Sequence, residues 1–145
     1  MKYTLDIYGS GPEKNNIQRK IEELNVGDRI KMRGSLSKME LLKVMNQKDI
    51  FVLYSSYEGL PHVVLEAFSS QCPVVASNIQ GTNEVAIDNE TAILAEPENP
   101  VRLAEAIRNL AWDKKLREQL SKRAFAKLKM DFAWGNHISK IKEIL

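Results

Sequence analysis

The chain has 145 residues, of which 43% are hydrophobic and 28% are charged, and its formal net charge is +2. This composition is typical of a globular protein with a hydrophobic core, and the small net charge gives no electrostatic field that would favour nucleic acid. A single cysteine, Cys72, excludes an intrachain disulfide framework, and no apolar run approaches the length of a membrane span.

The first third of the chain predicts a strand, a helix and a second strand. Residues 3–8 show the apolar alternation of a strand and end in a glycine- and proline-rich turn at residues 9–12. A helix is predicted over residues 13–24, with Gly27 as the left-handed residue that closes it, and residues 29–33 alternate again as a strand.

The middle of the chain repeats this order. Ser37 and Glu40 have the spacing of a capping box, which predicts a helix that begins there. Residues 49–54 are almost continuously apolar, as a strand covered on both faces would be. A helix opened by Pro61, over residues 61–70, then leads to a second buried strand at residues 73–76.

The last third predicts one more strand, residues 91–95, and then three helices, over 99–112, from Asp113 onward and over 134–145. This alternation with short connections indicates an α/β fold with a doubly wound parallel sheet, Rossmann-like in its organisation. Because ligands of such sheets bind beyond the carboxyl ends of the strands, the candidate site consists of the loops that follow strands, at residues 9–11, 34–35, 55–61 and 77–84.

Two carboxylates mark one of these loops. Glu58 lies just before the Gly59-Leu60-Pro61 turn, and Glu66 lies about one turn inside the helix that follows. They can face one pocket in which unpaired backbone N–H groups and the helix dipole favour an anion. From spacing alone, two ordinary solvated carboxylates explain the pattern equally well. Their place at a strand end, among small residues, favours a phosphorylated, hydroxyl-rich ligand.

The remaining motifs carry less chemistry. The segment GSGPEK has Lys14 where a dinucleotide fingerprint has its third glycine, so a structural turn is predicted, with a secondary role in lining a nucleotide cleft as the alternative. His62 belongs to no nucleophile–acid constellation, so a neutral surface imidazole, or one that touches the ligand, is predicted. Two histidines with one cysteine give no metal-ligand cluster. The basic residues after Asp113 form either a solvated face or a patch for a membrane or an acceptor.

The segment YSSYEGLPHVVLEAFSSQCPVVAS resembles the signature of family 4 retaining glycosyltransferases of the GT-B fold, with Glu-Gly-x-Pro, Leu-Glu-Ala and Pro-Val-Val-Ala in order. The segments IYGSGPEK, DRIKMRGSL, LAEPENPVRLAEAI and DFAW are similar to other parts of that family, so the resemblance spans nearly the whole chain. It implies the C-terminal, donor-binding half of a hexosyltransferase that makes a glycan, polysaccharide or glycolipid. The resemblance also implies a metal-independent enzyme without a cofactor, whose substrate is a nucleotide diphosphate sugar.

The resemblance also implies roles for individual residues. Glu58 would contact the donor sugar as the catalytic residue, and Glu66 would bind the ribose hydroxyls. The turn and helix start that contain Gly59, Leu60, His62 and Val63 would meet the diphosphate or the sugar. The loop that contains Ser35 and Leu36 would lie beside the nucleobase. The family often has glycine at four positions where this chain has Gln71, Gln80, Asn89 and Ala92, and Gln80 would narrow the donor site or add a sugar contact.

As the resemblance implies, residues 1–145 would be a single donor-binding domain without the N-terminal acceptor domain and the first strand–helix unit, and inactive alone. A sugar or lipid-linked acceptor would bind through that missing domain, and no nucleic acid partner is expected. We expect a cytoplasmic protein and leave peripheral membrane association open. The alternative is a non-catalytic, doubly wound regulatory or interaction module.

Overall fold

The computed structural model describes residues 3–131, so the helix predicted over residues 134–145 lies outside the described residues. The chain divides into two compact units, Met1–Leu41 and Leu42–Leu145. Strand and helix alternate along both units, as predicted, and every strand pair is parallel. The strands form one two-stranded and one three-stranded sheet.

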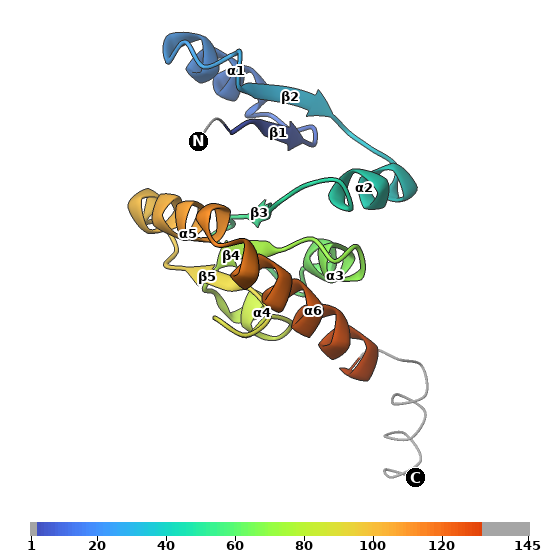
Figure 1. Ribbon diagram of the computed structural model, residues 1–145. Coiled ribbons are helices and arrows are strands. Elements are labelled where there is room, and N and C mark those ends of the chain that lie inside the picture. The colour runs from blue at the N-terminus through green and yellow to red at the C-terminus, as the bar shows by residue number, and fades with distance from the viewer. Residues whose placement is uncertain (1–2, 132–145) are drawn as a thin grey trace. The chain divides into compact units, whose positions relative to one another are not determined.

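The N-terminal unit is a strand–helix–strand arrangement (Figure 1). Its elements are β1 (Leu5–Tyr8), α1 (Lys14–Glu23) and β2 (Ile30–Gly34), and α2 (Lys38–Met45) spans the boundary to the next unit. The two strands pair in parallel, and an ion pair joins them, with Arg33 Nε 2.6 Å from Asp6 Oδ1. The neighbouring carboxylate raises the pKa of Arg33, first through the hydrogen bond and then through its charge.

The C-terminal unit contains the other elements, namely β3 (Phe51–Leu53), α3 (His62–Ser69), β4 (Val74–Ser77), α4 (Gln80–Asn83), β5 (Ile93–Ala95), α5 (Pro100–Trp112) and α6 (Lys114–Asp131). The strand order β3-β4-β5 places β4 in the centre, and all four of its residues are buried. Helix α5 packs against β4, β5 and α6, and α3 packs against β4 and α6. A cluster of buried hydrophobic residues in this core consists of Val75, Ala95, Ala106, Leu110 and Leu120.

The helix ends follow the capping signals in the sequence. The capping box at α2 is confirmed, because Glu40 Oε2 accepts from the Ser37 backbone N–H at 2.9 Å and the Glu40 N–H donates to Ser37 Oγ at 3.4 Å. The Ser37 hydroxyl also donates to Glu40 Oε2 at 2.6 Å, and this bond, followed by the one from the Ser37 N–H, lowers the pKa of the Glu40 carboxyl. Helix α6 starts after Asp113, whose Oδ1 accepts from the Leu116 N–H at 2.8 Å.

Two of the four positions at which the family often has glycine, Gln71 and Asn89, have left-handed backbone in this chain. Gln71 has φ +53° directly after α3, where the Cys72 N–H bonds the Ala67 carbonyl in a Schellman arrangement. Asn89 has φ +57°. The backbone at Gln71 is therefore strained, since a residue with a side chain is disfavoured at φ > 0.

Three predictions were wrong in detail. Asn25, with φ +50°, is the left-handed residue after α1, because an asparagine tolerates this conformation and the turn closes two residues before Gly27. Strand β3 is half-buried instead of covered on both faces, because it is the edge of its sheet. The segment after β4 contains the short helix α4, where only a loop was predicted.

Candidate donor site

In the N-terminal unit, the segments that follow β1 and β2 meet, as the parallel topology predicts. The Gly9 N–H donates to the Gly34 carbonyl at 2.9 Å, and the hydroxyls of Ser10 and Ser35 are 3.2 Å apart. Gly9 and Gly34 have φ of +135° and +76°, which a residue with a side chain would adopt only with strain. The predicted nucleobase residues therefore lie on this edge, with Ser35 exposed and Leu36 half-buried.

In the C-terminal unit, Tyr54 ties the segments after β3 and β5 together across the sheet edge. Its hydroxyl donates to the Glu96 carbonyl at 2.5 Å and accepts from the Asn99 N–H at 2.7 Å. Tyr54 directly follows β3, so these bonds anchor the base of the loop that contains Glu58.

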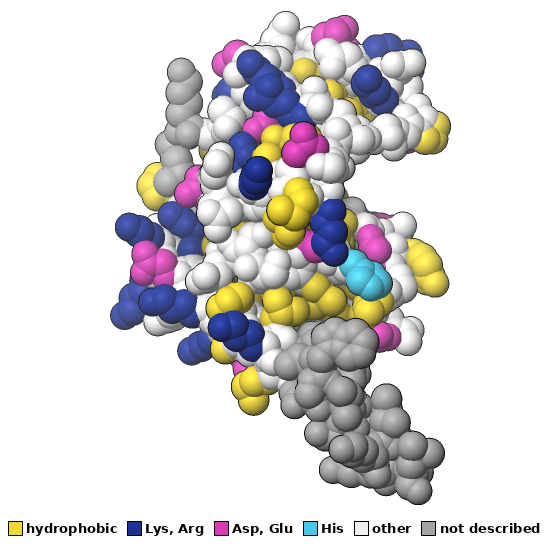
Figure 2. Space-filling view, turned by 90° about the vertical axis from the view of Figure 1, so that its right-hand side faces the viewer, with side chains coloured by type: hydrophobic (Ala, Val, Ile, Leu, Met, Phe, Trp, Pro, Cys, Tyr) yellow, Lys and Arg dark blue, Asp and Glu magenta, His cyan; other side chains and the backbone are white. Residues whose placement is uncertain are grey.

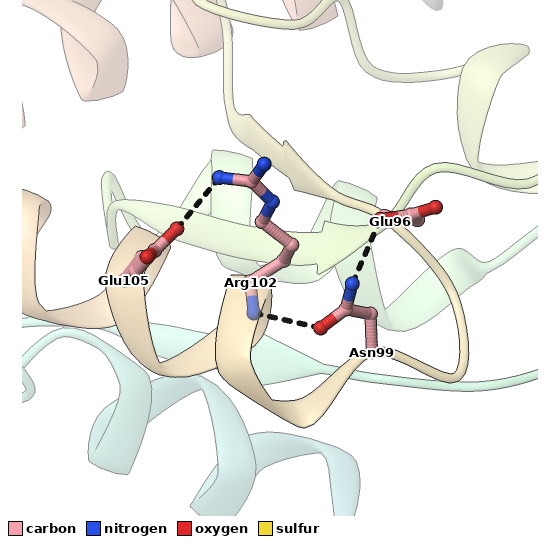
Figure 3. Close-up of polar contacts among 4 residues, drawn as sticks. All are labelled: Glu96, Asn99, Arg102 and Glu105. Carbon is pink, nitrogen blue, oxygen red and sulfur yellow. Dashed lines mark hydrogen bonds and ion pairs between the residues drawn. The ribbon is translucent and has the colours of Figure 1, made fainter.

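The segment after β5 is itself held in place by side chains at the start of α5 (Figure 3). Asn99 caps the helix, because its Oδ1 accepts from the Arg102 N–H at 3.2 Å, and its amide donates to Glu96 Oε2 at 2.9 Å. Arg102 forms an ion pair with Glu105 at 2.9 Å one turn further on. This network fixes the segment against which Tyr54 is anchored.

Glu58 is half-buried and its carboxylate has a defined partner. The Ser55 hydroxyl donates to Glu58 Oε1 at 2.6 Å, a short hydrogen bond of the charge-assisted kind. The main chain of the same loop lies against α4, where a Cβ built on Gly81 would be 2.1 Å from the Gly59 carbonyl oxygen. Glu58 is therefore held by both its side chain and its backbone.

The start of α3 contains the other predicted residues. His62 and Gly59 are exposed, Val63 and Glu66 are half-buried, and Leu60 is 41% exposed. Figure 2 shows a histidine side chain, in cyan, on the surface of the molecule. The N–H groups of His62 and Val64 donate to the carbonyls of Leu60 and Pro61 at 2.9 Å. The prediction of unpaired N–H groups here was wrong for these two, because the turn before the helix satisfies them.

Two buried polar groups lie at opposite ends of β4, Ser77 at its carboxyl end and Cys72 just before its start. Ser77, at the carboxyl end of β4, is 1% exposed, and its hydroxyl has no hydrogen-bond partner among the described residues. Cys72 is buried as predicted, and desolvation, helped by the charge of Asp49, raises the pKa of its thiol to about 11. No cluster of three or more potential metal ligands exists within residues 3–131.

The structure thus brings six of the eight predicted donor-site residues to one loop and helix start, and it places Ser35 and Leu36 at a strand end of the other unit. Sequence reasoning missed Tyr54, and it included Ser55 and Gly81 only as members of the candidate loops, without a role for either. Only Gly81 had a signal, as a glycine after a buried strand. Ser55 had no such signal, because a serine three residues before a glutamate does not by itself indicate a contact between the two side chains.

Comparison with known proteins identifies the family. Residues 1–127 match the family described as "Glycosyl transferases group 1". A glycogen synthase of Mycobacterium tuberculosis is 31% identical over 131 residues, which are 90% of this chain and 32% of that protein. An alpha-D-kanosaminyltransferase of Streptomyces kanamyceticus is 30% identical over 118 residues, 81% of this chain and 31% of that protein. The chain therefore spans about a third of the length of these relatives.

Solved structures agree with this assignment. A mutant of S. aureus TarM, crystallised with fondaparinux, alpha-GlcNAc-glycerol and UDP, superposes with a TM-score of 0.87 at 26% identity, over 97% of this chain and 28% of that one. The predicted Rossmann-like α/β fold is thereby confirmed. Within the part of the chain that the structure describes, no helix is long and apolar enough to cross a membrane. The chain belongs to the glycosyl transferases group 1 family.

Proposed function

We propose that this chain is the donor-binding part of a retaining glycosyltransferase, which transfers a hexose from a nucleotide diphosphate sugar to an acceptor. The observation that supports this most directly is the Glu58 loop, held at the carboxyl edge of a parallel sheet in a chain of this family. The structural relative TarM was crystallised with UDP, and the sequence relatives are a kanosaminyltransferase and a glycogen synthase.

In this proposal Glu58 contacts the donor sugar and Glu66 the ribose hydroxyls, since a carboxylate accepts the hydrogen bonds that hydroxyls donate. Gly59, Leu60, His62 and Val63 lie between them in the sequence and would line the sugar and diphosphate. Catalysis would consist mainly of orienting the sugar and stabilising the leaving diphosphate, without a metal or a further cofactor.

The whole reaction requires more than this chain in our proposal. The chain covers about a third of its curated relatives, so the acceptor, a sugar or a lipid-linked sugar, would bind a further domain. Donor binding is then the activity to test first. Titration of UDP, GDP and ADP sugars should move amide signals near Glu58 and Glu66 in NMR spectra. If none of them moves any signal, the donor-site proposal fails and a regulatory or interaction module takes its place.

Variants of Glu66 test the ribose role. Glu66→Gln should weaken binding of both the nucleotide sugar and the free nucleoside diphosphate, because both contain the ribose. The matched control is Glu118→Gln on the exposed side of α6, which should leave both affinities unchanged. Equal affinities for the Glu66 variant and the wild type would contradict the assigned role.

The outer side of α6 supports peripheral association with an anionic membrane, which we also propose for the intact enzyme. Lys115, Lys122 and Lys129 are exposed and spaced seven residues apart, so they share one helix face, and Trp112 nearby in sequence is 66% exposed. Each lysine near an anionic bilayer contributes about 1 kcal/mol. Replacing all three with glutamate should abolish sedimentation with phosphatidylglycerol vesicles. Equal sedimentation with neutral phosphatidylcholine vesicles would contradict the proposal.

A further inference from the structure

We propose that Ser55 and Gly81 are positioning residues that hold the Glu58 carboxylate in place for the donor sugar before any ligand binds. This inference rests on the proposed function, because Glu58 is assigned there to the sugar. It adds two residues to the site, Ser55, which acts on the side chain of Glu58, and Gly81, which acts on its backbone.

Gly81 acts through a close backbone approach. A Cβ at this position would lie 2.1 Å from the Gly59 carbonyl oxygen and 2.2 Å from that of Glu58. Real Cβ atoms essentially never come within 3.0 Å of a heavy atom to which they are not bonded. Both carbonyl oxygens belong to the backbone, so neither can rotate away as a side chain could. Gly81 has no positive φ and lies within α4, so the need for glycine here is one of space and not of conformation. Any side chain would push the Glu58–Gly59 main chain outward.

Ser55 acts on the carboxylate. Its hydroxyl donates to Oε1 of Glu58 at 2.6 Å, and both residues are half-buried, which strengthens the bond relative to one in water. The residue before it, Tyr54, is anchored to the segment after β5 by two hydrogen bonds. Ser55 is therefore attached to a fixed point, and its hydroxyl limits the rotamers available to Glu58.

Together these contacts leave one carboxylate oxygen for a ligand. Oε1 is engaged by Ser55, whereas Oε2 has no hydrogen-bond partner among the described residues. A sugar hydroxyl that donates to Oε2 would meet an acceptor already oriented, so less conformational entropy is lost on binding. Without Ser55 or the close packing at Gly81, Glu58 would have to be ordered by the ligand itself.

The test compares two ligands, the nucleotide sugar that the wild-type chain binds best and the nucleoside diphosphate without its sugar. Ser55→Ala and Gly81→Ala should each weaken binding of the nucleotide sugar by about tenfold, the equivalent of one hydrogen bond to a charged group. Binding of the diphosphate should change less than about twofold, because that ligand lacks the group that Glu58 would contact. Ser55→Thr keeps the hydroxyl and should restore the wild-type ratio of the two affinities.

Gly27→Ala is the matched control, because its Cβ would meet only Ile21 at an ordinary 3.7 Å. It should leave both affinities unchanged. Equal weakening of both ligands by Ser55→Ala and Gly81→Ala would show a general structural role and overturn the inference, as would no weakening of either. If Gly81→Ala does not fold, the Ser55→Ala and Ser55→Thr pair decides alone. Failure of the wild-type chain to bind either ligand would instead refute the proposed function.

Discussion

The two units of this chain differ sharply in how much apolar surface they bury. Among the described residues of the N-terminal unit, only Ile21 is a buried hydrophobic residue, at 6% exposure. The C-terminal unit contains all the others, among them Phe68, Leu110 and Leu120 at 1% exposure or less. A segment of about 40 residues rarely supports a core of its own, so we infer that the C-terminal unit supplies most of the stability.

The same difference applies to the two sets of predicted donor-site residues, one in each unit. The Glu58 loop is anchored by Tyr54, Ser55 and the contact at Gly81, all within the unit that has the core. The glycine-rich edge with Ser35 is joined by one backbone bond and one contact between serine hydroxyls. A rigid Glu58 loop and a more compliant strand edge at Ser35 are the expected consequence, because local stability follows buried contacts.

The largest effect should come from opening the C-terminal core. Phe68→Ala should lower the free energy of unfolding by about 3–5 kcal/mol, through lost burial and the cavity left behind. Ile21→Ala, the counterpart in the N-terminal unit, should cost about 2 kcal/mol, because fewer buried groups surround it. Urea unfolding followed by circular dichroism measures both. An equal or larger loss for Ile21→Ala would break the comparison between the units.

A pH series tests the interior of the C-terminal unit through Cys72. The pKa of its thiol is about 11 in the folded chain, whereas the ordinary value for a cysteine thiol is 9.0. Below pH 9 the thiol keeps its proton in both the folded and the unfolded chain, so the stability of the folded chain is not reduced by thiol ionisation. As pH rises from about 9 to 11, the thiol ionises in the unfolded chain only, and the free energy of unfolding falls. The loss should reach about 2–3 kcal/mol, at about 1.4 kcal/mol per pKa unit.

The control is the same series on Cys72→Ala, which removes the thiol and leaves every other ionisable side chain in place. The difference between the two curves isolates Cys72. Parallel curves for the two proteins from pH 8 to 11 would mean that the thiol is not desolvated. Alkylation of the native wild type by iodoacetamide at pH 8 should also be slow and become fast in urea, because the thiolate is the reactive form.

Local signals in the sequence predicted the elements well. The capping box at Ser37, the cap at Asp113 and the proline at the start of α5 all follow from hydrogen-bond requirements within a few residues. The order of strands and helices followed from hydrophobic periodicity. The turn after α1 was misassigned because asparagine and glycine both tolerate φ > 0, so periodicity cannot choose between Asn25 and Gly27.

Contacts between segments distant in sequence were beyond the same reasoning. Tyr54 reaches Glu96 and Asn99, more than 40 residues away, and Gly81 meets Glu58 and Gly59 across the sheet edge. Such contacts depend on strand order and on the detailed path of each loop. The parallel topology predicted which loops would share an edge, but not which atoms would touch. The roles of Glu58 and Glu66 likewise remain predictions until a ligand is bound.

The smallest effect concerns helix starts, where the two units again differ. Helix α5 is capped by the Asn99 side chain, whereas the Glu13 side chain makes no capping bond at α1. Asn99→Ala should therefore cost about 1 kcal/mol, and Glu13→Ala less than about 0.5 kcal/mol. Asn99→Ser separates the two bonds of this side chain: serine still accepts from the N–H of the first turn but cannot donate to Glu96 as the amide does. If Asn99→Ser is as unstable as Asn99→Ala in urea unfolding, the contact with Glu96 stabilises this segment and the cap does not. If it is as stable as the wild type, the cap suffices, and the segment that anchors Tyr54 depends on helix geometry alone.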